Sequence, residues 1–139
     1  MPRLEYFLVS GGAAIDQITG RISAFDILIE IRPVRLPVVF ARVVTICSFS
    51  FEEDEMNSDC QLVTRITPPG GQAAENRTNF TIRDRHHNIV LNWVGVRINQ
   101  AGSVDFELRL NENVVAHHDI TVHAPQAGRI DGILIYPQA

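Results

Sequence analysis

The chain of 139 residues contains no lysine, no long apolar run and only two cysteines. Its twelve basic residues are all arginine, from which no function follows, and sixteen acidic residues give a formal net charge of −4. This negative balance removes the electrostatic basis for a nucleic-acid partner. Because no apolar stretch approaches the roughly 20 residues of a membrane-spanning helix, we expect no membrane span.

The two cysteines, Cys47 and Cys60, are too few for a disulfide-based scaffold. The first ten residues carry charge within their only apolar run and lack the long apolar core of a secretion signal. We therefore expect a cytoplasmic protein with free thiols. The cysteines flank an acidic segment in strands that we expect to pair, so they could also face each other within the ~7 Å that a disulfide needs.

Motifs that define common enzyme classes are also missing. The sequence contains no G-x-S-x-G, H-E-x-x-H, C-x-x-C or G-x-G-x-x-G. Residues 68–71 include two glycines but are followed by neither a lysine nor a helix, so they predict a turn rather than a phosphate cradle. We assign no catalytic residue and expect no cofactor. A hydrolase assembled from distant histidines and carboxylates is the remaining catalytic alternative.

The clearest positive signal is alternation of polarity in residues 103–122. Every second residue from Val104 to Leu110 is apolar, which indicates a strand with one buried face. Residues 111–113 predict a tight turn, since asparagine tolerates the left-handed backbone. A lone hairpin is marginally stable, so a second layer must cover its apolar face. On the returning strand we expect four residues on that face: Val114, Ala116, Ile120 and Val122.

Turn signals recur about every ten residues along the rest of the chain, which is typical of an antiparallel sandwich or barrel. We predict one domain, residues 1–139, folded as an all-β antiparallel sandwich of eight or nine strands, immunoglobulin-like or C2-like. We expect Gly11 and Gly12 to end the first strand, and Pro33 and Pro37 to bracket an irregular crossing. The remaining expected strands cover residues 4–9, 14–18, 21–25, 38–51, 60–67, 74–82 and 89–98.

The C-terminal tail, residues 123–139, is too apolar between Ile130 and Tyr136 to be a free end. We expect it to dock on its own sandwich. The alternative is that it adds a strand to a neighbouring copy, because exposed sheet edges invite pairing.

The densest group of oxygen ligands is an acidic loop between the strands at residues 38–51 and 60–67. Hard oxygen ligands on a sandwich loop are typical of calcium sites. The loop lacks the glycine and closing glutamate of a helix–loop–helix site, and acidic runs are usually solvated. No metal site is assigned, and the metal candidates are Glu52, Glu53, Asp54, Glu55, Asn57 and Asp59.

Five histidines occur, namely His86, His87, His117, His118 and His123. Adjacent residues on a strand point to opposite faces, so neither adjacent pair can hold one ion from within its strand. A transition-metal site would need ligands from two or three segments. We expect His118, in phase with Ala116 and Ile120, to be half-buried with a hydrogen-bond partner.

Several strands are apolar on both faces, and such strands are either covered twice or form an interface. We expect Trp93 and Phe49 in the core, and Phe7, Phe40 and Val38 as a face for a partner. The first functional hypothesis is a non-catalytic interaction or assembly module that contacts itself, as a homodimer, or another protein. The alternative is a calcium- or small-ligand-binding sandwich that uses residues 52–59.

Four segments resemble a family of uncharacterised small bacterial β-sandwich proteins. They are L-E-Y-F-L-V-S, G-R-I-S-A-F-D-I-L-I-E-I, P-V-V-F-A-R-V-V and G-x3-F-E-L-R-L-N-x3-V-A-H. The resemblance covers roughly residues 1–122, and the tail between Ile130 and Tyr136 departs from it. It implies the sandwich fold and supplies no functional residue.

Overall fold

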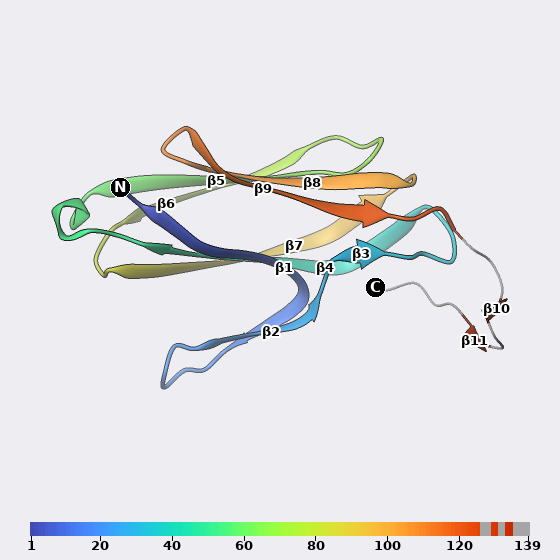
Figure 1. Cartoon of the computed structure of the whole chain (residues 1–139), viewed down its shortest axis with the longest axis horizontal. Helices are drawn as coiled ribbons and strands as arrows, with labels where there is room; N and C mark the ends of the chain where they lie inside the picture. Colours follow the sequence, from blue (N-terminus) through green and yellow to red (C-terminus); the bar gives the residue numbers. More distant parts are fainter. Residues whose placement is uncertain (126–128, 131–132, 135–139) are drawn as a thin grey trace.

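The computed structural model describes residues 1–125, 129–130 and 133–134, and most of them form two β-sheets packed face to face (Figure 1). In these residues the one helical element is a 3-10 turn, η1 (Glu53–Glu55). The strands are β1 (Arg3–Ile15), β2 (Ile22–Ile27), β3 (Glu30–Ile31), β4 (Val38–Ser50), β5 (Asp59–Thr67), β6 (Ala74–Thr81), β7 (His86–Ile98), β8 (Gly102–Leu110), β9 (Asn113–Val122), β10 (Arg129–Ile130) and β11 (Ile133–Leu134).

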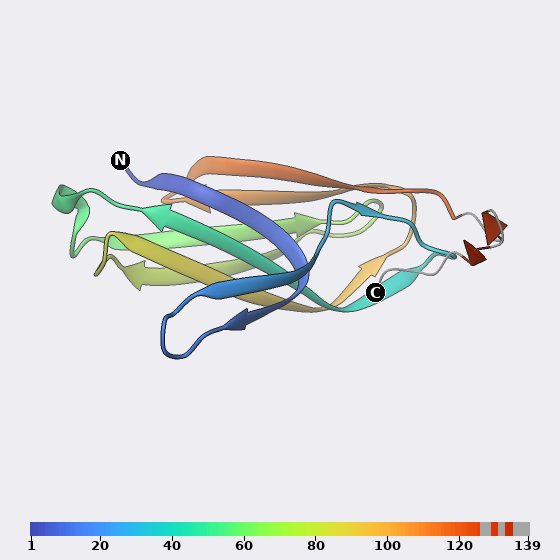
Figure 2. The same ribbon diagram turned by 60° about the horizontal axis from the view of Figure 1, so that its bottom comes forward.

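Nine strands build the sandwich. The four-stranded sheet has the order β2-β1-β4-β7, and the five-stranded sheet has the order β3-β9-β8-β5-β6. All neighbours are antiparallel except β3 and β9, which pair in parallel over two residues. The N-terminus lies beside η1 at one end of the sandwich (Figures 1 and 2). The predicted all-β antiparallel sandwich of eight or nine strands is confirmed.

The core lies between the two sheets, where alternate residues of each strand point. On β8 the four predicted inward residues, Val104 to Leu110 at every second position, are at most 4% exposed. Leu62 and Leu108 from the five-stranded sheet meet Phe49 from the four-stranded sheet, and all three are 0% exposed. Full burial of such a side chain stabilises the fold by roughly 1.5–3 kcal/mol, which neither sheet obtains alone.

The returning strand of the β8–β9 hairpin differs from the prediction at one point. Val114 was expected to face the core but is 54% exposed, whereas Val115 packs on it. The cause is a β-bulge: Leu108 pairs with Ala116 and Arg109 pairs with Val114, so Val115 is an extra residue. A bulge of this kind moves the alternation by one position.

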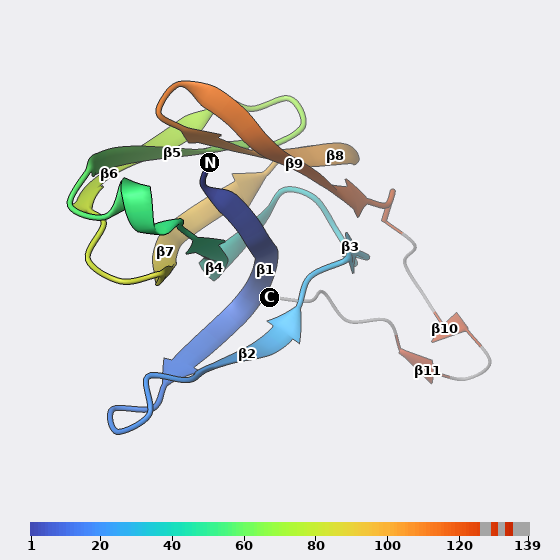
Figure 3. The same ribbon diagram turned by 60° about the vertical axis from the view of Figure 1, so that its left-hand side comes forward.

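The first strand also differs from the prediction, because Gly11 and Gly12 bend it rather than end it. β1 continues through both glycines to Ile15 and pairs with β2 from Ser10 onward. The resulting β1–β2 hairpin, hereafter the arm (residues 10–27), stands away from the body of the sandwich (Figures 1 and 3). The predicted turn around Thr19 and Gly20 is confirmed at its tip, where Gly20 has φ +72°.

The expected partner face is wrong. Phe40 is 3% exposed in the core, and Phe7 and Val38 are partly buried against it. Phe49 is a core residue as predicted, and the partly buried Trp93 packs on the core and donates a hydrogen bond to Thr45 Oγ1 at 3.0 Å. Strand β4 is buried at every position from Val43 to Phe49, so both of its faces are covered there, whereas Val39 near its start is 51% exposed.

The tail prediction falls largely outside the described residues, which include only four residues of the segment beyond Pro125. There β10 and β11 pair with each other. Within the part of the chain that the structure describes, no helix has the length and apolar character to cross a membrane.

Replacement of Leu108 by alanine should lower the free energy of unfolding by about 2–5 kcal/mol, because it removes a fully buried side chain and leaves a cavity between the sheets. Urea unfolding followed by circular dichroism measures the change. The control is Val94→Ala, at a side chain that is 84% exposed, which should change stability by less than about 0.5 kcal/mol. Equal effects of the two substitutions would contradict the assigned core.

Candidate functional site

The six predicted oxygen ligands lie in and around η1, and four of the six residues have a partner for a side-chain oxygen. The N-terminal ammonium lies 3.2 Å from Glu52 and 3.5 Å from Glu55, and Arg85 lies 3.7 Å from Glu53. Asp59 accepts a hydrogen bond from Thr81 at 2.8 Å. The carboxylates of Glu52, Asp54 and Glu55 do approach one another within 4.8 Å. The structure therefore brings three of the six together, on an exposed turn.

The histidines occupy separate environments. His118 is half-buried as predicted, but its ring has no hydrogen-bond partner among the described residues. Its contacts are aromatic, with ring centroids 6.1 Å from Phe7 and 6.4 Å from Phe106. The ring of His87 stacks on Phe80 with centroids 4.2 Å apart, and burial lowers the pKa of His87. His123 lies 2.9 Å from Glu30 beside the β3–β9 pair. His117 is the histidine that the structure places beside carboxylates of two strands.

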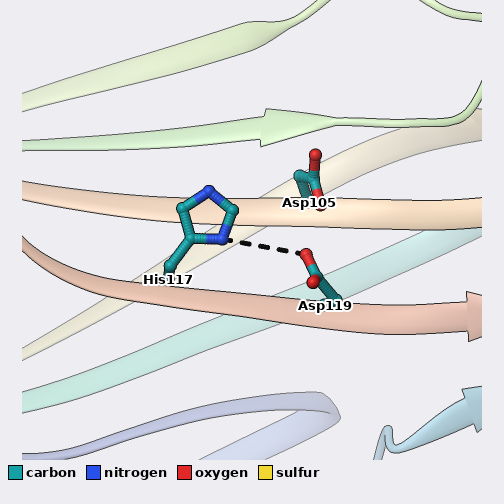
Figure 4. A group of neighbouring side chains, drawn as sticks. All are labelled: Asp105, His117 and Asp119. Carbon is teal, nitrogen blue, oxygen red and sulfur yellow. Dashed lines mark ion pairs between the residues drawn. The ribbon is translucent and has the colours of Figure 1, made fainter.

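Asp105, His117 and Asp119 form a cluster on the outer face of the five-stranded sheet (Figure 4). Asp105 on β8 is the direct partner of Asp119 on β9, and His117 lies two residues before Asp119 on the same strand. His117 Nδ1 is 3.8 Å from Asp119 Oδ1, and one ligand atom from each residue lies within 4.8 Å of the others. Side chains two residues apart on a strand point to the same face, and so do those of directly paired residues. All three side chains therefore lie on one side of the sheet.

The electrostatic setting of this cluster differs from that of the remaining outer face. Elsewhere, opposite charges are neighbours: Arg65 lies 2.8 Å from Glu75, and Arg109 holds Glu107. Asp105 and Asp119 instead place two carboxylates side by side. The hydrogen bond with Asp119, followed by partial burial, raises the pKa of Asp105, while His117 acts in the opposite direction. The pKa of Glu107 is lowered, mainly by its hydrogen bond from Arg109.

Sequence reasoning missed this cluster because its members meet only through the register of the hairpin. The two-residue turn at Asn111 and Glu112 by itself would oppose Asp105 to His118. The bulge at Val115 moves every later pair by one position, which brings Asp105 opposite Asp119. A usable signal was present, since Ile120 and Val122 face the core only in the shifted register.

The second notable surface is the arm, which carries much of the exposed apolar area of the described residues. The exposed fractions are 55% for Ile15, 95% for Ile18, 53% for Phe25 and 52% for Ile27. Beside the arm, on the four-stranded sheet to which it belongs, lies an open groove of about 260 Å³, lined by Tyr6, Leu8, Ile22, Ala24 and Ile46. The apolar side chains of the arm are therefore exposed, whereas the predicted face around Phe40 is covered by the sandwich.

These features define the protein as an all-β sandwich with a charged outer face on one sheet and an apolar arm on the other. The chain belongs to a family of unknown function (DUF6941), whose model matches residues 5–123. This match confirms the resemblance to uncharacterised β-sandwich proteins and leaves residues 124–139 outside the matched region. The comparison with curated proteins finds no match.

Replacement of Asp119 by asparagine should stabilise the protein at pH 7 in metal-free buffer by a few tenths of a kcal/mol, because it removes an exposed like-charge pair. A raised pKa means that folded Asp105 holds its proton more tightly than the unfolded chain does. That contribution is complete below the ordinary pKa of 3.8 and is lost as the pH rises through the raised pKa. Urea unfolding at several pH values should therefore show an advantage of the variant that shrinks toward pH 4.

Neither cysteine of the folded protein should react with iodoacetamide at pH 8. Cys47 and Cys60 are free and buried, and burial raises the pKa of the Cys47 thiol to about 12. The reactive thiolate of Cys47 is therefore scarce, and both sulfur atoms belong to buried residues. Mass spectrometry should detect two added groups after unfolding in urea and none before. Rapid labelling of the native protein would contradict the assigned burial.

Proposed function

We propose that the protein is a non-catalytic assembly module that pairs with a second copy of itself along the free edge of β2. The observation that carries this proposal is that β2 is both an outer strand of its sheet and a carrier of half-exposed apolar side chains, Phe25 and Ile27. An outer strand presents unpaired backbone N–H and C=O groups, which template the addition of another strand. Apolar side chains beside such an edge make the addition favourable.

The other outer strands of the described sandwich carry more protection. Strand β6 holds Glu75 and Arg77, which form an ion pair at 3.6 Å. Strand β7 contains Gly95 at φ +69°, which interrupts the extended backbone. Strand β9, which pairs with the outer strand β3 over only two residues, carries His117 and Asp119 on its remaining length. Strand β2, I-S-A-F-D-I, has Asp26 as its single charge, and Asp26 also has a positive φ of +54°, which leaves residues 22–25 as the regular, uncharged part of this edge. Charges and irregular backbone are the features that keep edges apart.

Self-pairing of β2 suits the symmetry of a homodimer. Two copies of one strand related by a two-fold axis run antiparallel, so the same edge serves both partners. A register centred on one residue of β2 would place Phe25 of both copies on the same face, where each covers the other, and Ile27 follows beyond the positive φ of Asp26. The groove would lie on the opposite face of the paired strands, because Ile22 and Ala24, which line it, alternate with Phe25 along β2.

Ligand binding at residues 52–59 is supported less strongly. The ammonium of Met1 and the side chains of Arg85 and Thr81 engage the oxygens of Glu52, Glu53 and Asp59. Calcium prefers six to eight oxygen ligands, and it would have to displace these partners on an exposed turn.

The test is analytical ultracentrifugation of the wild type and of the double variant Phe25→Lys, Ile27→Lys across roughly 1–100 µM, a range suited to modest interfaces. We expect the wild type to dimerise with increasing concentration. The double variant should stay monomeric with an unchanged circular dichroism spectrum, because lysine on an edge opposes strand addition. A wild type that is monomeric over the whole range would refute the proposal.

Two controls distinguish the arm from other contact surfaces. Val94→Lys alters an exposed side chain of β7 and should leave the dimer intact. Deletion of residues 124–139 tests the alternative that the tail adds a strand to a neighbour, and should also leave it intact. Loss of the dimer in either control, with the Phe25 and Ile27 variant still dimeric, would assign association to β7 or to the tail.

A further inference from the structure

We propose that Asp105, His117 and Asp119 bind one divalent transition-metal ion of the zinc class on the outer face of the five-stranded sheet. This inference is independent of self-association through β2, because it concerns the other sheet. It rests on the placement of the three side chains, on their mixed donor atoms and on the charge pattern around them.

The backbone positions the three side chains as a convergent set. Residues two apart on a strand point to the same face, so His117 and Asp119 stand side by side on β9. Asp105 is the cross-strand partner of Asp119, at a spacing of roughly 4.5–5.5 Å between Cβ atoms. The three residues thus form the corners of a small triangle held by paired strands rather than by a loop (Figure 4). A site on strands is held more firmly than one on a loop.

The donor atoms favour zinc over calcium. The cluster offers one imidazole nitrogen and two carboxylates, and imidazole suits zinc, copper and nickel, whereas calcium takes oxygen ligands alone. Three protein ligands with water in the remaining position is a common zinc arrangement. The group around Glu52, Asp54 and Glu55 contains only oxygens. The two clusters should therefore differ in the class of metal that they prefer.

The distances require only local adjustment. Ligand atoms on a tetrahedral zinc ion lie roughly 3.3 Å apart, given metal–ligand bonds of about 2.0–2.2 Å. The corresponding atoms here lie within 4.8 Å of one another, and His117 and Asp119 have side chains more than half exposed. Rotations about side-chain bonds at the surface can close the difference without moving the strands.

The charge pattern provides a reason for the cluster to take a cation. The outer face of this sheet otherwise joins Arg65 to Glu75 and Arg109 to Glu107. Asp105 and Asp119 have no arginine partner among the described ion pairs, and the residue of β5 opposite Asp105 is the uncharged Thr67. Like charges directly opposite each other on a sheet are destabilising. A bound divalent cation converts this repulsion into attraction.

The experiment is isothermal titration calorimetry of the untagged full chain with zinc chloride at pH 7.5, after treatment with a chelator. We expect one ion per chain, and a loss of affinity of about tenfold or more in Asp119→Asn and in His117→Gln, since each removes a ligand. Nuclear magnetic resonance of the imidazole rings gives a residue-specific readout. The signals of His117 should shift with zinc, and those of His86 should not.

Matched controls separate this site from others on the chain. The double variant Asp84→Asn, His86→Gln removes a carboxylate and a histidine near the start of β7, and should keep the wild-type affinity. Asp54→Asn tests the η1 cluster and should also leave zinc binding unchanged. The proposal is overturned if the wild type gives no zinc heat, if His117→Gln binds as tightly as the wild type, or if a control variant abolishes binding.

Discussion

The structure depends on the mutual covering of two apolar sheet faces. Phe49 of the four-stranded sheet and Leu62 and Leu108 of the five-stranded sheet are completely inaccessible to water, and each obtains its burial only from the opposite layer. Neither sheet can keep its alternating pattern stable alone. This constraint fixes which side of every strand faces inward. The side chains left outside the core include the charged cluster on one sheet and the apolar residues of the arm on the other.

The β8–β9 hairpin shows how two local requirements can conflict and be reconciled. Its two-residue turn, with φ +49° at Asn111 and +72° at Glu112, sets a register in which Val115 faces the core. Ile120 and Val122 face the core only if the register is shifted by one residue. The bulge at Val115 satisfies both, so that Val115 and Ala116 both pack on the core opposite Leu108. The same bulge places Asp105 directly opposite Asp119.

Most of the fold could be predicted from the sequence, because the alternation of apolar and polar residues is a local signal. It shows, strand by strand, which face is buried. The sandwich, the turn at Gly20 and the inward residues of β8 follow from it. The role of Gly11 and Gly12 did not, since glycine marks the end of a strand and a bend within one equally well. The cluster of Asp105, His117 and Asp119 required the register between strands, which depends on a bulge. The apolar arm required knowing that Phe7 and Phe40 would be covered.

The two outer faces differ in a way that bears on how the proposed activities relate. The four-stranded sheet exposes apolar side chains on its arm, whereas the five-stranded sheet exposes Arg65, Glu75, Glu107 and the carboxylates of Asp105 and Asp119. The proposed association uses the first face, because burying the second would cost the desolvation of many charges. A dimer joined through β2 therefore leaves the cluster of each copy open to solvent and to ions. Metal binding and self-association should consequently be separable, and a substitution at His117 should leave the dimer unchanged.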